Sequence, residues 1–302
     1  LFALLAVSYA LTPGFASLFD GSDFLTWRRQ AVLLTGYAGL LFMTAAIVLA
    51  TRPVWLEPWL GGLDKTYALH KWVGIAAGIA LTLHWLAEKS ARWMVEGGWL
   101  VAPAGHGRHG HGQGFGWMGL AKELGEWAFY LLLILVIIAL VKKIPYRFFH
   151  LLHKALAVVF LAGAYHAVMF TPGPWYAGPA GWLIVVSVVA GIIAAGLSLT
   201  GRIGASRFIK GRIEEVSVGA GGGVDLRLAL PEPGLRYQAG QFVFLCFDPA
   251  EGAHPFTVAS ADDPRHPRFA IKPLGDYTRT LAQSLAPGQE VFHSADPGQP
   301  SG

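Results

Sequence analysis

The sequence lacks several features on which soluble enzymes commonly depend. Its 302 residues include a single cysteine, Cys246, which excludes an internal disulfide and any cysteine-based metal or iron–sulfur site. No Ser–His–Asp set, zinc signature or carboxylate pair suggests hydrolysis, and no G-x-G-x-x-G strand–helix unit for a dinucleotide occurs. The glycine run at 219–223 lacks the Lys-Ser/Thr of a phosphate-binding loop, so it predicts a hairpin turn.

Apolar residues are what the sequence has in excess. They make up 54% of the chain, and the mean hydropathy is +0.46, which is too apolar for a soluble domain and indicates a membrane protein. The formal net charge is +4. Because membrane proteins keep lysine and arginine in their cytoplasmic loops, this charge does not indicate nucleic-acid binding.

Six apolar runs approach the length of about 20 residues that a helix needs to cross a bilayer. They lie at 1–19, 30–50, 67–87, 125–141, 149–170 and 180–199. The chain begins with Leu1 and no basic stretch precedes the first run, so we expect a truncated first membrane helix rather than a signal peptide. The sequence therefore predicts an all-α bundle of six membrane helices.

Two of these runs carry two histidines each, one near either end. His70 and His84 lie in one run, and His153 and His166 lie in another. An ionisable side chain inside a bilayer is costly and is a functional hypothesis by default. Because neutral imidazole is a common axial ligand of haem iron, the matched pairs indicate two metal centres stacked across the membrane. The alternative is four buried histidines that only bond to backbone carbonyls.

Helix geometry supports the two pairs unequally. The 14-residue separation of His70 and His84 corresponds to about 21 Å of rise and a misalignment of about 40° on an ideal helix. The 13-residue separation of His153 and His166 gives about 20 Å but about 140°. The second helix must therefore be wound differently, with Gly163 as one place for a distortion, or offer its histidines from opposite flanks.

Lysine and arginine gather in loops that should share one side of the membrane. These residues are Arg52, Lys65, Lys71, Lys142, Lys143, Arg147, Lys154, Arg202, Arg207, Lys210 and Arg212. Cytoplasmic loops carry such an excess, so we expect this side, and the region after residue 200, to be cytoplasmic. His70 and His153 then lie at the cytoplasmic level, and His84 and His166 lie at the opposite level.

Two further groups could bind ligands on the opposite side. A glycine-rich loop at 105–112 carries three histidines and is either a metal-collecting tract or simply flexible. Arg28, Arg29 and Arg92 either neutralise haem propionates or act as interfacial anchors.

The character of the sequence changes at about residue 200. Strand-like alternation follows at 208–218, 224–230, 241–247, 256–260 and 268–274, and residues 276–284 predict a short helix. Glycine and proline separate these short runs, as is typical of a small all-β antiparallel barrel.

Two strings in this second region carry recognisable chemistry. They are His-Pro-Phe-Thr-Val-Ala-Ser at 254–260 and Ile-Lys-Pro-Leu-Gly-Asp-Tyr-Thr-Arg at 271–279. Together with the histidine pairs, they resemble the ferric reductase / NADPH oxidase family of transmembrane flavocytochromes over nearly the whole chain. The 13-residue spacing is also that family's pattern, which favours haem ligation. The resemblance implies a six-helix transmembrane haem-binding domain over 1–200 and an incomplete FAD-binding, ferredoxin-reductase-type β-barrel domain over 201–302.

The resemblance also implies ligands for two b-type haems and for FAD. His70 and His153 would hold one haem, and His84 and His166 the other. The residues implied for FAD are His254, Pro255, Phe256, Thr257, Ser260, Lys272, Gly275 and Thr278. Among them Phe256 and Thr257 would contact the isoalloxazine and ribityl part, and the Lys272 to Thr278 stretch would hold the diphosphate near the amides that begin a short helix.

One departure from the family concerns the end of the chain. Members continue with a nicotinamide-binding domain, and Gly288 to Phe292 fits the approach to it, but residues 293–302 do not match. We therefore expect a C-terminally truncated chain without its own NAD(P)H site. NAD(P)H would then donate electrons through a missing domain or a partner.

The expected function is that of an oxidoreductase in a bacterial plasma membrane. Electrons would pass from cytoplasmic NAD(P)H through FAD and two haems to ferric iron or O2 outside. The protein would contact membrane lipid and would not bind nucleic acid. One alternative is a quinol-linked cytochrome b subunit without flavin, which leaves the His-Pro-Phe-Thr strand unexplained. A second is a transporter or membrane anchor without a redox role, which leaves the paired histidines unexplained.

Overall fold

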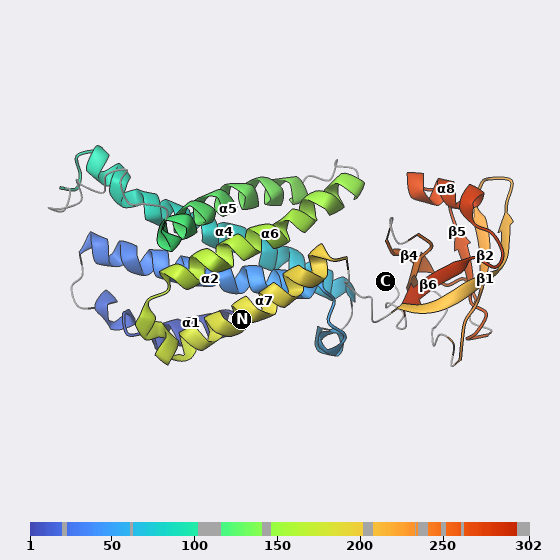
Figure 1. Cartoon of the computed structure of the whole chain (residues 1–302), viewed down its shortest axis with the longest axis horizontal. Helices are drawn as coiled ribbons and strands as arrows, with labels where there is room; N and C mark the ends of the chain where they lie inside the picture. Colours follow the sequence, from blue (N-terminus) through green and yellow to red (C-terminus); the bar gives the residue numbers. More distant parts are fainter. Residues whose placement is uncertain are drawn as a thin grey trace. The chain divides into compact units, whose positions relative to one another are not determined.

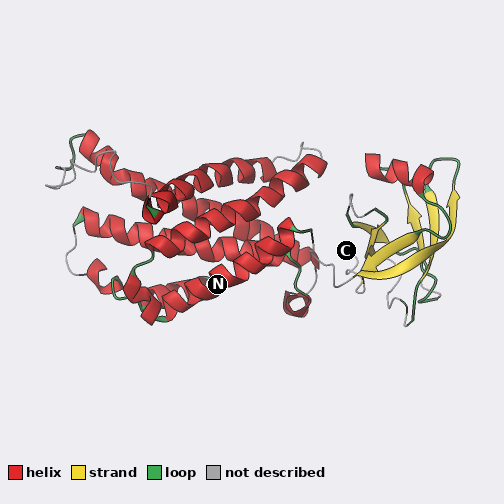
Figure 2. Cartoon of the chain, in the orientation of Figure 1, coloured by secondary structure: helices red, strands yellow, loops and turns green. Residues whose placement is uncertain are grey.

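The protein divides into two compact units. One consists of Leu1–Pro53 and Tyr67–Ile203, and the other of Val54–Thr66 and Gly204–Gly302. This computed structural model describes residues 1–19, 23–60, 63–101, 116–140, 146–201, 208–232, 234, 241–248, 252–260 and 263–294. The first unit is helical, whereas the strands all belong to the second (Figure 2).

Long helices run alongside one another in the helical unit (Figure 1). They are α2 (Phe24–Ala50), α4 (Leu63–Glu96), α5 (Trp117–Leu140), α6 (Tyr146–Phe170) and α7 (Pro179–Leu199). Shorter helical segments of this unit are α1 (Phe2–Ala10), η1 (Phe15–Leu18) and η4 (Gly173–Ala177), whereas η2 (Val54–Leu56) and α3 (Glu57–Leu60) belong to the second unit. Helix α5 packs along α6, and α7 packs on both α2 and α6. Within the described residues, the backbone of α4 does not come as close to a neighbouring helix as the backbones of α5 and α6 come to each other.

Four helices of the described part are long and apolar enough to cross a membrane. They are α2, α5, α7 and the Leu152–Phe170 part of α6, and each overlaps a predicted apolar run. Helix α4 is longer than a bilayer requires but is not among them. Its apolar stretch contains His70, Lys71 and His84, which lower its hydropathy. The predicted count of six membrane helices is therefore not confirmed.

The first apolar run does not form one helix. Helix α1 ends at Ala10, and the hydroxyl of Thr12 donates to the carbonyl of Tyr9 at 2.7 Å. Pro13 has no amide hydrogen and disfavours a helical conformation in the residue before it. The expectation of a membrane-length helix over 1–19 was wrong, because this proline stops the helix after nine residues.

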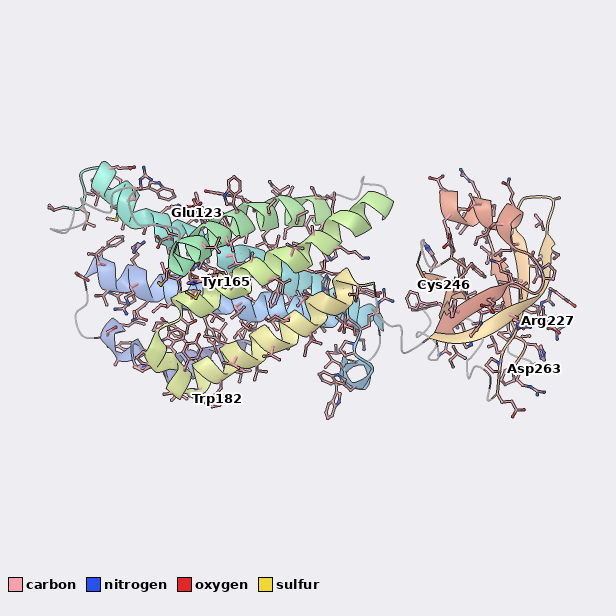
Figure 3. The ribbon with its side chains drawn as sticks, viewed as in Figure 1. Glu123, Tyr165, Trp182, Arg227, Cys246 and Asp263 are labelled. Carbon is pink, nitrogen blue, oxygen red and sulfur yellow. The ribbon has the colours of Figure 1, made fainter. Side chains whose placement is uncertain are left out.

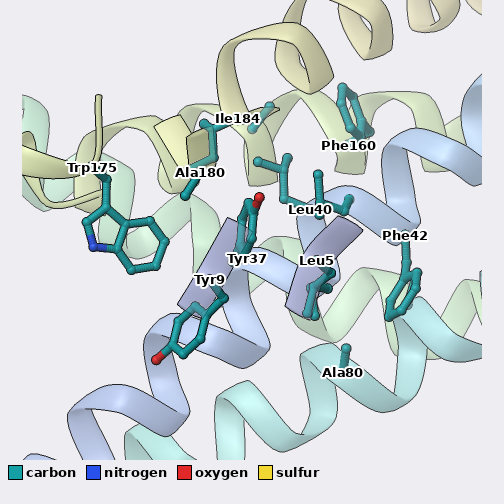
Figure 4. Close-up of a cluster of buried hydrophobic side chains, with 14 of the residues drawn as sticks. Leu5, Tyr9, Tyr37, Leu40, Phe42, Ala80, Phe160, Trp175, Ala180 and Ile184 are labelled. Carbon is teal, nitrogen blue, oxygen red and sulfur yellow. The ribbon is translucent and has the colours of Figure 1, made fainter. Parts of the chain in front are cut away.

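Aromatic rings and satisfied polar groups join α1 and η4 to α2 (Figure 4). Trp175 lies between Tyr9 and Tyr37, with 5.8 Å between its ring centroid and that of each tyrosine. The Tyr37 hydroxyl bonds to that of Ser8 at 2.8 Å, and Tyr9 donates to the side chain of Gln30 at 2.7 Å. Buried polar atoms cost little when paired, so this cluster holds α1 firmly on the bundle.

The exposed faces of the helical unit suit a lipid environment. Large exposed apolar side chains on α5 and α7 include Leu131, Ile134, Ile137, Val186, Val189 and Ile193. Exposed tryptophans stand where α2, α5 and α7 begin and where α4 ends: Trp27, Trp93, Trp117 and Trp182, the last labelled in Figure 3. Tryptophan is enriched at the boundary between lipid and water. This end of the bundle therefore belongs at a membrane surface.

An antiparallel sheet of six strands forms the second unit, within the residues that are described. The strands are β1 (Phe208–Val218), β2 (Val224–Ala229), β3 (Phe242–Cys246), β4 (His254–Thr257), β5 (Arg268–Ile271) and β6 (Glu290–Ser294), and α8 (Asp276–Ser284) follows β5. Their hydrogen-bonded order is β4-β3-β6-β1-β2-β5. The sequence predicted five strands and α8 near these positions. It did not predict β6, which pairs with both β1 and β3.

The two end strands of this order meet at one bridge. Val258, directly after β4, pairs with Phe269 of β5, and the amide of Ala259 donates to the carbonyl of Arg268 at 2.8 Å. No ladder of further pairs closes the sheet in the described residues. The fold is thus an antiparallel sheet as predicted, but a closed barrel is not confirmed.

The glycine run forms the turn between β1 and β2. The amide of Gly219 donates to the carbonyl of Gly223, and the amide of Gly222 donates to the carbonyl of Gly219, both at 2.9 Å. Gly222 has a φ of +74°, in the left-handed region that favours glycine. The predicted hairpin turn is confirmed.

Alternating burial explains how the sheet places α8. On β2, Val224, Leu226 and Leu228 are buried while the residues between them are not. Helix α8 adds Leu281 to the same core, so its position against the sheet is fixed by apolar packing. The start of α8 carries one of the two recognised strings, and β4 carries the other.

Candidate functional site

The four histidines predicted as ligands form two pairs that bridge α4 and α6. The ring centroids of His70 and His153 are 5.7 Å apart, and those of His84 and His166 are 6.2 Å apart. Helices α4 and α6 run in the same direction, because the lower-numbered histidines pair together and the higher-numbered ones pair together. At a rise of 1.5 Å per residue, the two pairs are about 20 Å apart along the helices.

Hydrogen bonds fix the orientation of three of these rings. The Nδ1 atoms of His70 and His84 bond to carbonyls of α2, Ala46 and Val32, each at 2.9 Å. The Nδ1 of His166 bonds to the carbonyl of Ala121 in α5 at 3.0 Å. A carbonyl oxygen only accepts, so Nδ1 carries the proton and Nε2 keeps its lone pair. Metal-ligating histidines commonly use the non-ligating nitrogen in this way.

The 13-residue spacing on α6 is accommodated without a break in the helix. α6 is an α-helix from Tyr146 to Phe170, and Gly163 lies within it. His166 bonds towards α5 while its ring faces His84, so it leaves α6 on the flank between two neighbours. Both histidines therefore sit on an uninterrupted helix, and Gly163 does not break it.

Two glycines that sequence reasoning missed lie against the rings of His84 and His166. A Cβ on Gly36 of α2 would come within 3.0 Å of Cε1 and Nδ1 of His84. A Cβ on Gly125 of α5 would overlap Nδ1 of His166. No sequence signal singles out these glycines, because their role depends on which helices are neighbours.

The paired imidazoles fit a haem better than a metal ion held by protein alone. The described residues contain no group of three or more His, Cys, Asp or Glu side chains that could hold a metal ion. A haem needs only axial ligands from the protein. A metal–imidazole bond is about 2 Å long, so two rings on opposite sides of one metal have centroids about 6 Å apart. Both observed separations are close to that value.

Ion pairs occupy two arginines that were candidates for haem propionates. Arg28 of α2 binds both the carboxylate of Glu88, at 2.7 Å, and its backbone carbonyl, at 2.6 Å. Arg92 pairs with Glu96 on its own helix at 2.7 Å. Arg28 therefore links α2 to α4 one turn beyond His84, and its charge is already balanced by a carboxylate.

The two recognised strings of the second unit meet through their aromatic side chains. The imidazole of His254, which begins β4, stacks on the ring of Tyr277 in the first turn of α8, with centroids 4.0 Å apart. The sequence named His254 as a candidate but not Tyr277. The two strings that carry the family resemblance therefore meet at this contact between His254 and Tyr277.

The residues of β4 are divided between two faces. Phe256 is buried in the sheet core and its ring centroid lies 6.0 Å from that of Phe247, whereas Pro255 and Thr257 are exposed. Successive strand residues point to opposite faces. The Phe256 side chain therefore supports the strand from within, while Thr257 is free to meet a ligand. Ser260 is partly exposed after the bridge to β5.

The start of α8 is held by a reciprocal hydrogen-bond pair. The amide of Gly275 donates to the hydroxyl of Thr278, and this hydroxyl donates to the carbonyl of Gly275, both at 3.0 Å. Lys272 and Gly275 are exposed. This leaves the first amides of α8 near an exposed lysine, an arrangement that suits an anion.

Some predicted residues lie outside the described part of the chain. These are His106, His109 and His111 of the glycine-rich loop, with Lys142, Lys143, Arg202 and Arg207.

Two sequence families match the chain, one on each part. A family described as "Ferric reductase like transmembrane component" matches residues 35–164, and one described as "FAD-binding domain" matches residues 210–297. The first match contains His70, His84 and His153 and ends two residues before His166. The second contains both recognised strings. The chain is therefore an integral membrane protein with an FAD-binding part.

A curated relative and two solved structures are also similar. Respiratory burst oxidase homolog protein E of Arabidopsis thaliana is 28% identical over 142 residues, which are 46% of this chain and 14% of that protein. This chain thus spans a small part of its relative's length. A ferredoxin NADP+ reductase from Neisseria gonorrhoeae with bound FAD and NADP is 20% identical, with a TM-score of 0.27 over 30% of this chain and 38% of that one. A flavohemoglobin from Malassezia yamatoensis with bound FAD and heme is 16% identical, with a TM-score of 0.31 over 90% and 63%.

Proposed function

Because the chain belongs to the ferric reductase / NADPH oxidase family, we propose that it carries electrons through a membrane, from FAD to two b-type haems and on to an acceptor. The reductant is NAD(P)H. The acceptor is ferric iron or O2 on the opposite side.

The observation that carries this proposal is the pair of histidine contacts between α4 and α6. Ring separations of 5.7 and 6.2 Å leave each pair able to bind one iron. The two pairs are about 20 Å apart along the helices, so two sites at these depths would make each electron-transfer distance shorter than the bilayer core of about 30 Å. Buried histidines without a ligand would not need to meet in pairs at two depths.

The protein's part is to supply axial nitrogens and to fix their direction. His70 and His153 would hold one iron, and His84 and His166 would hold the other, each through Nε2. The carbonyls of Ala46, Val32 and Ala121 accept the Nδ1 protons and so keep Nε2 available. Held by two imidazoles each, the haems would supply single-electron transfer rather than O2 binding at iron.

When bound, FAD and haem supply the redox chemistry, because the flavin exchanges both electron pairs and single electrons and the haems exchange single electrons. Thr257 contacts the flavin from the exposed face of β4. His254 and Tyr277 together form an aromatic surface beside it. Lys272 and the amides at the start of α8 bind the diphosphate, because a helix N-terminus and a lysine both attract anions.

The sequence supports an orientation in which the FAD-binding part is cytoplasmic. Lys71 and Lys154, each next to a histidine of the His70–His153 pair, and Lys210, which follows α7, agree with the excess of basic residues found on the cytoplasmic side. In this orientation His70 and His153 would hold the haem nearer the cytoplasm, and His84 and His166 would hold the haem nearer the opposite side. A bacterial plasma membrane is the proposed location.

The test is to count haem and flavin in the purified full chain. We expect about two b-type haems per chain in a pyridine haemochrome assay, and FAD after reconstitution. His84→Ala should lower the haem count from two to one and leave FAD unchanged. Thr257→Ala should weaken FAD binding and leave haem unchanged. His266→Ala is the matched control, because His266 bonds to Asp263 within the second unit and belongs to neither histidine pair.

Two results would contradict the proposal. A folded wild-type chain with far fewer than two haems would remove the relay. Haem without any FAD, even when FAD is supplied in excess, would favour a quinol-linked cytochrome instead.

A further inference from the structure

Gly36 and Gly125 occupy equivalent places beside the His84–His166 pair. In an α-helix the amide of residue i bonds to the carbonyl of residue i−4. The carbonyl four residues before Gly36 is that of Val32, and the one four residues before Gly125 is that of Ala121. These are the two carbonyls that accept Nδ1 protons from His84 and His166. The same local arrangement therefore occurs on two different helices.

Steric space explains why glycine stands at both positions. A helical side chain points back over the turn that precedes it, so a residue at i covers the carbonyl of i−4. Without a Cβ, Gly36 and Gly125 leave that carbonyl open to an imidazole from a neighbouring helix. The two positions differ in how little space they leave. A Cβ added at Gly36 would lie 3.0 Å from the nearest atoms of the His84 ring, and a Cβ added at Gly125 would overlap the His166 ring.

The His70–His153 pair provides an internal comparison. His70 bonds to the carbonyl of Ala46, and the residue four positions later is Ala50. A histidine can therefore reach a helical carbonyl beside an alanine. What glycine adds at the other pair is a ring that lies directly against the helix backbone. The two pairs are thus held differently, and only one of them depends on glycine.

We propose that Gly36 and Gly125 are positioning residues that set the ring positions of His84 and His166, and thereby the properties of one haem but not of the other. This inference rests on the proposed haem function and deepens it. Alanine at either position displaces the ring away from α2 or α5, which weakens the Nδ1 bond and tilts the axial nitrogen.

The variants Gly36→Ala and Gly125→Ala test this inference in the full-length, haem-loaded protein. For Gly125→Ala we expect the loss of one of two haems, because the overlap falls on Nδ1 itself. For Gly36→Ala we expect both haems to remain, with one low-spin electron paramagnetic resonance signal and one of the two reduction potentials shifted. The other signal and potential should match those of the wild type.

Two glycines offer matched controls. Gly119→Ala lies on α5 with no atom within 4 Å of the added Cβ, so it should change nothing. Gly39→Ala lies on α2 and its Cβ would overlap Leu81, so it imposes a steric load without touching a histidine. It should lower thermal stability while both haem signals stay as in the wild type.

The outcomes separate this inference from the function on which it rests. A wild-type chain with far fewer than two haems would overturn the proposed function. Two haems in the wild type, with unchanged signals and potentials in both Gly36→Ala and Gly125→Ala, would overturn the glycine inference alone. An equal spectral shift in Gly39→Ala would also overturn it, because general packing would then be the cause.

Discussion

The imidazole of His254 lies nearly parallel to the phenol ring of Tyr277, with centroids 4.0 Å apart and an interplanar angle of 21°. His254 begins an end strand of the sheet, and Tyr277 stands in the first turn of α8. The contact joins the strand proposed for the flavin to the helix start proposed for its diphosphate. A change in either ring should therefore be felt across the whole FAD site.

Removing the Tyr277 ring should weaken FAD binding. An aromatic pair contributes about 0.5–1.5 kcal/mol beyond the area it buries. We therefore expect Tyr277→Ala to raise the FAD dissociation constant roughly two- to tenfold, measured by flavin fluorescence during titration of FAD-free protein. Tyr277→Phe keeps the stack and should bind FAD within twofold of the wild type. Equal affinities in the alanine variant and the wild type would show that the stack does not support the site.

The reciprocal bond pair between Gly275 and Thr278 predicts a separate effect. Thr278→Val keeps the shape but removes the hydroxyl that both donates and accepts at 3.0 Å. The loss of a capping interaction costs about 1 kcal/mol, so the start of α8 should fray and FAD should bind several-fold more weakly. Thr278→Ser should restore most of the affinity. Valine and serine variants with the same FAD dissociation constant would argue against the cap.

Local patterns predicted much of the fold. The apolar runs located α2, α5, α6 and α7, and the helix expected over 276–284 has the bounds of α8. The failures depend on longer-range relations. β6 was interpreted as the approach to another domain, because nothing in residues 290–294 indicates that β1 and β3 will cover both of its edges. His293 is 1% exposed, although a histidine in a short run does not predict burial.

The candidate site was predictable in part. Spacing and residue type brought the four histidines together as candidates, and the structure places them in two pairs. The carbonyls of Val32 and Ala121 were not predictable, because they depend on the register of α2 against α4 and of α5 against α6. The same holds for Gly36 and Gly125. Tyr277 was visible in its string, but only the packing of α8 on the sheet gives it His254 as a neighbour.

The single cysteine should react slowly with alkylating reagents. Burial raises the pKa of the Cys246 thiol, and the neighbouring Asp248 carboxylate raises it further. The thiolate is the reactive form, so a raised pKa lowers its fraction at pH 8. We expect iodoacetamide to label the folded chain more slowly than the urea-unfolded chain. The midpoint of the rate–pH profile should lie above pH 8.5, which is about the pKa of an ordinary thiol. Cys246→Ser is the unlabelled control, and a midpoint at or below pH 8.5 in the folded protein would contradict the shift.

The packing of α7 on α6 predicts a stability effect that reaches both histidine pairs. Phe160 lies on α6 between His153 and His166, is 2% exposed, and belongs to the cluster drawn in Figure 4. A Cβ on Gly191 of α7 would overlap its ring. Gly191→Ala should therefore destabilise the bundle by about 1–3 kcal/mol, the usual cost of overpacking. Loss of the haem absorbance on heating measures this, and both haems should be lost together because the displaced ring lies between their ligands.

A matched glycine on the same helix makes this prediction specific. Gly196 is exposed, and no atom lies within 4 Å of a Cβ added there. Gly196→Ala should be neutral or should stabilise the helix by up to about 1 kcal/mol, since alanine has the higher helix propensity. Phe160→Leu in the Gly191→Ala background should recover part of the loss, because the smaller side chain relieves the overlap. If the effects of the two substitutions on stability simply add, the Phe160 ring is not the group that restricts side-chain size at residue 191.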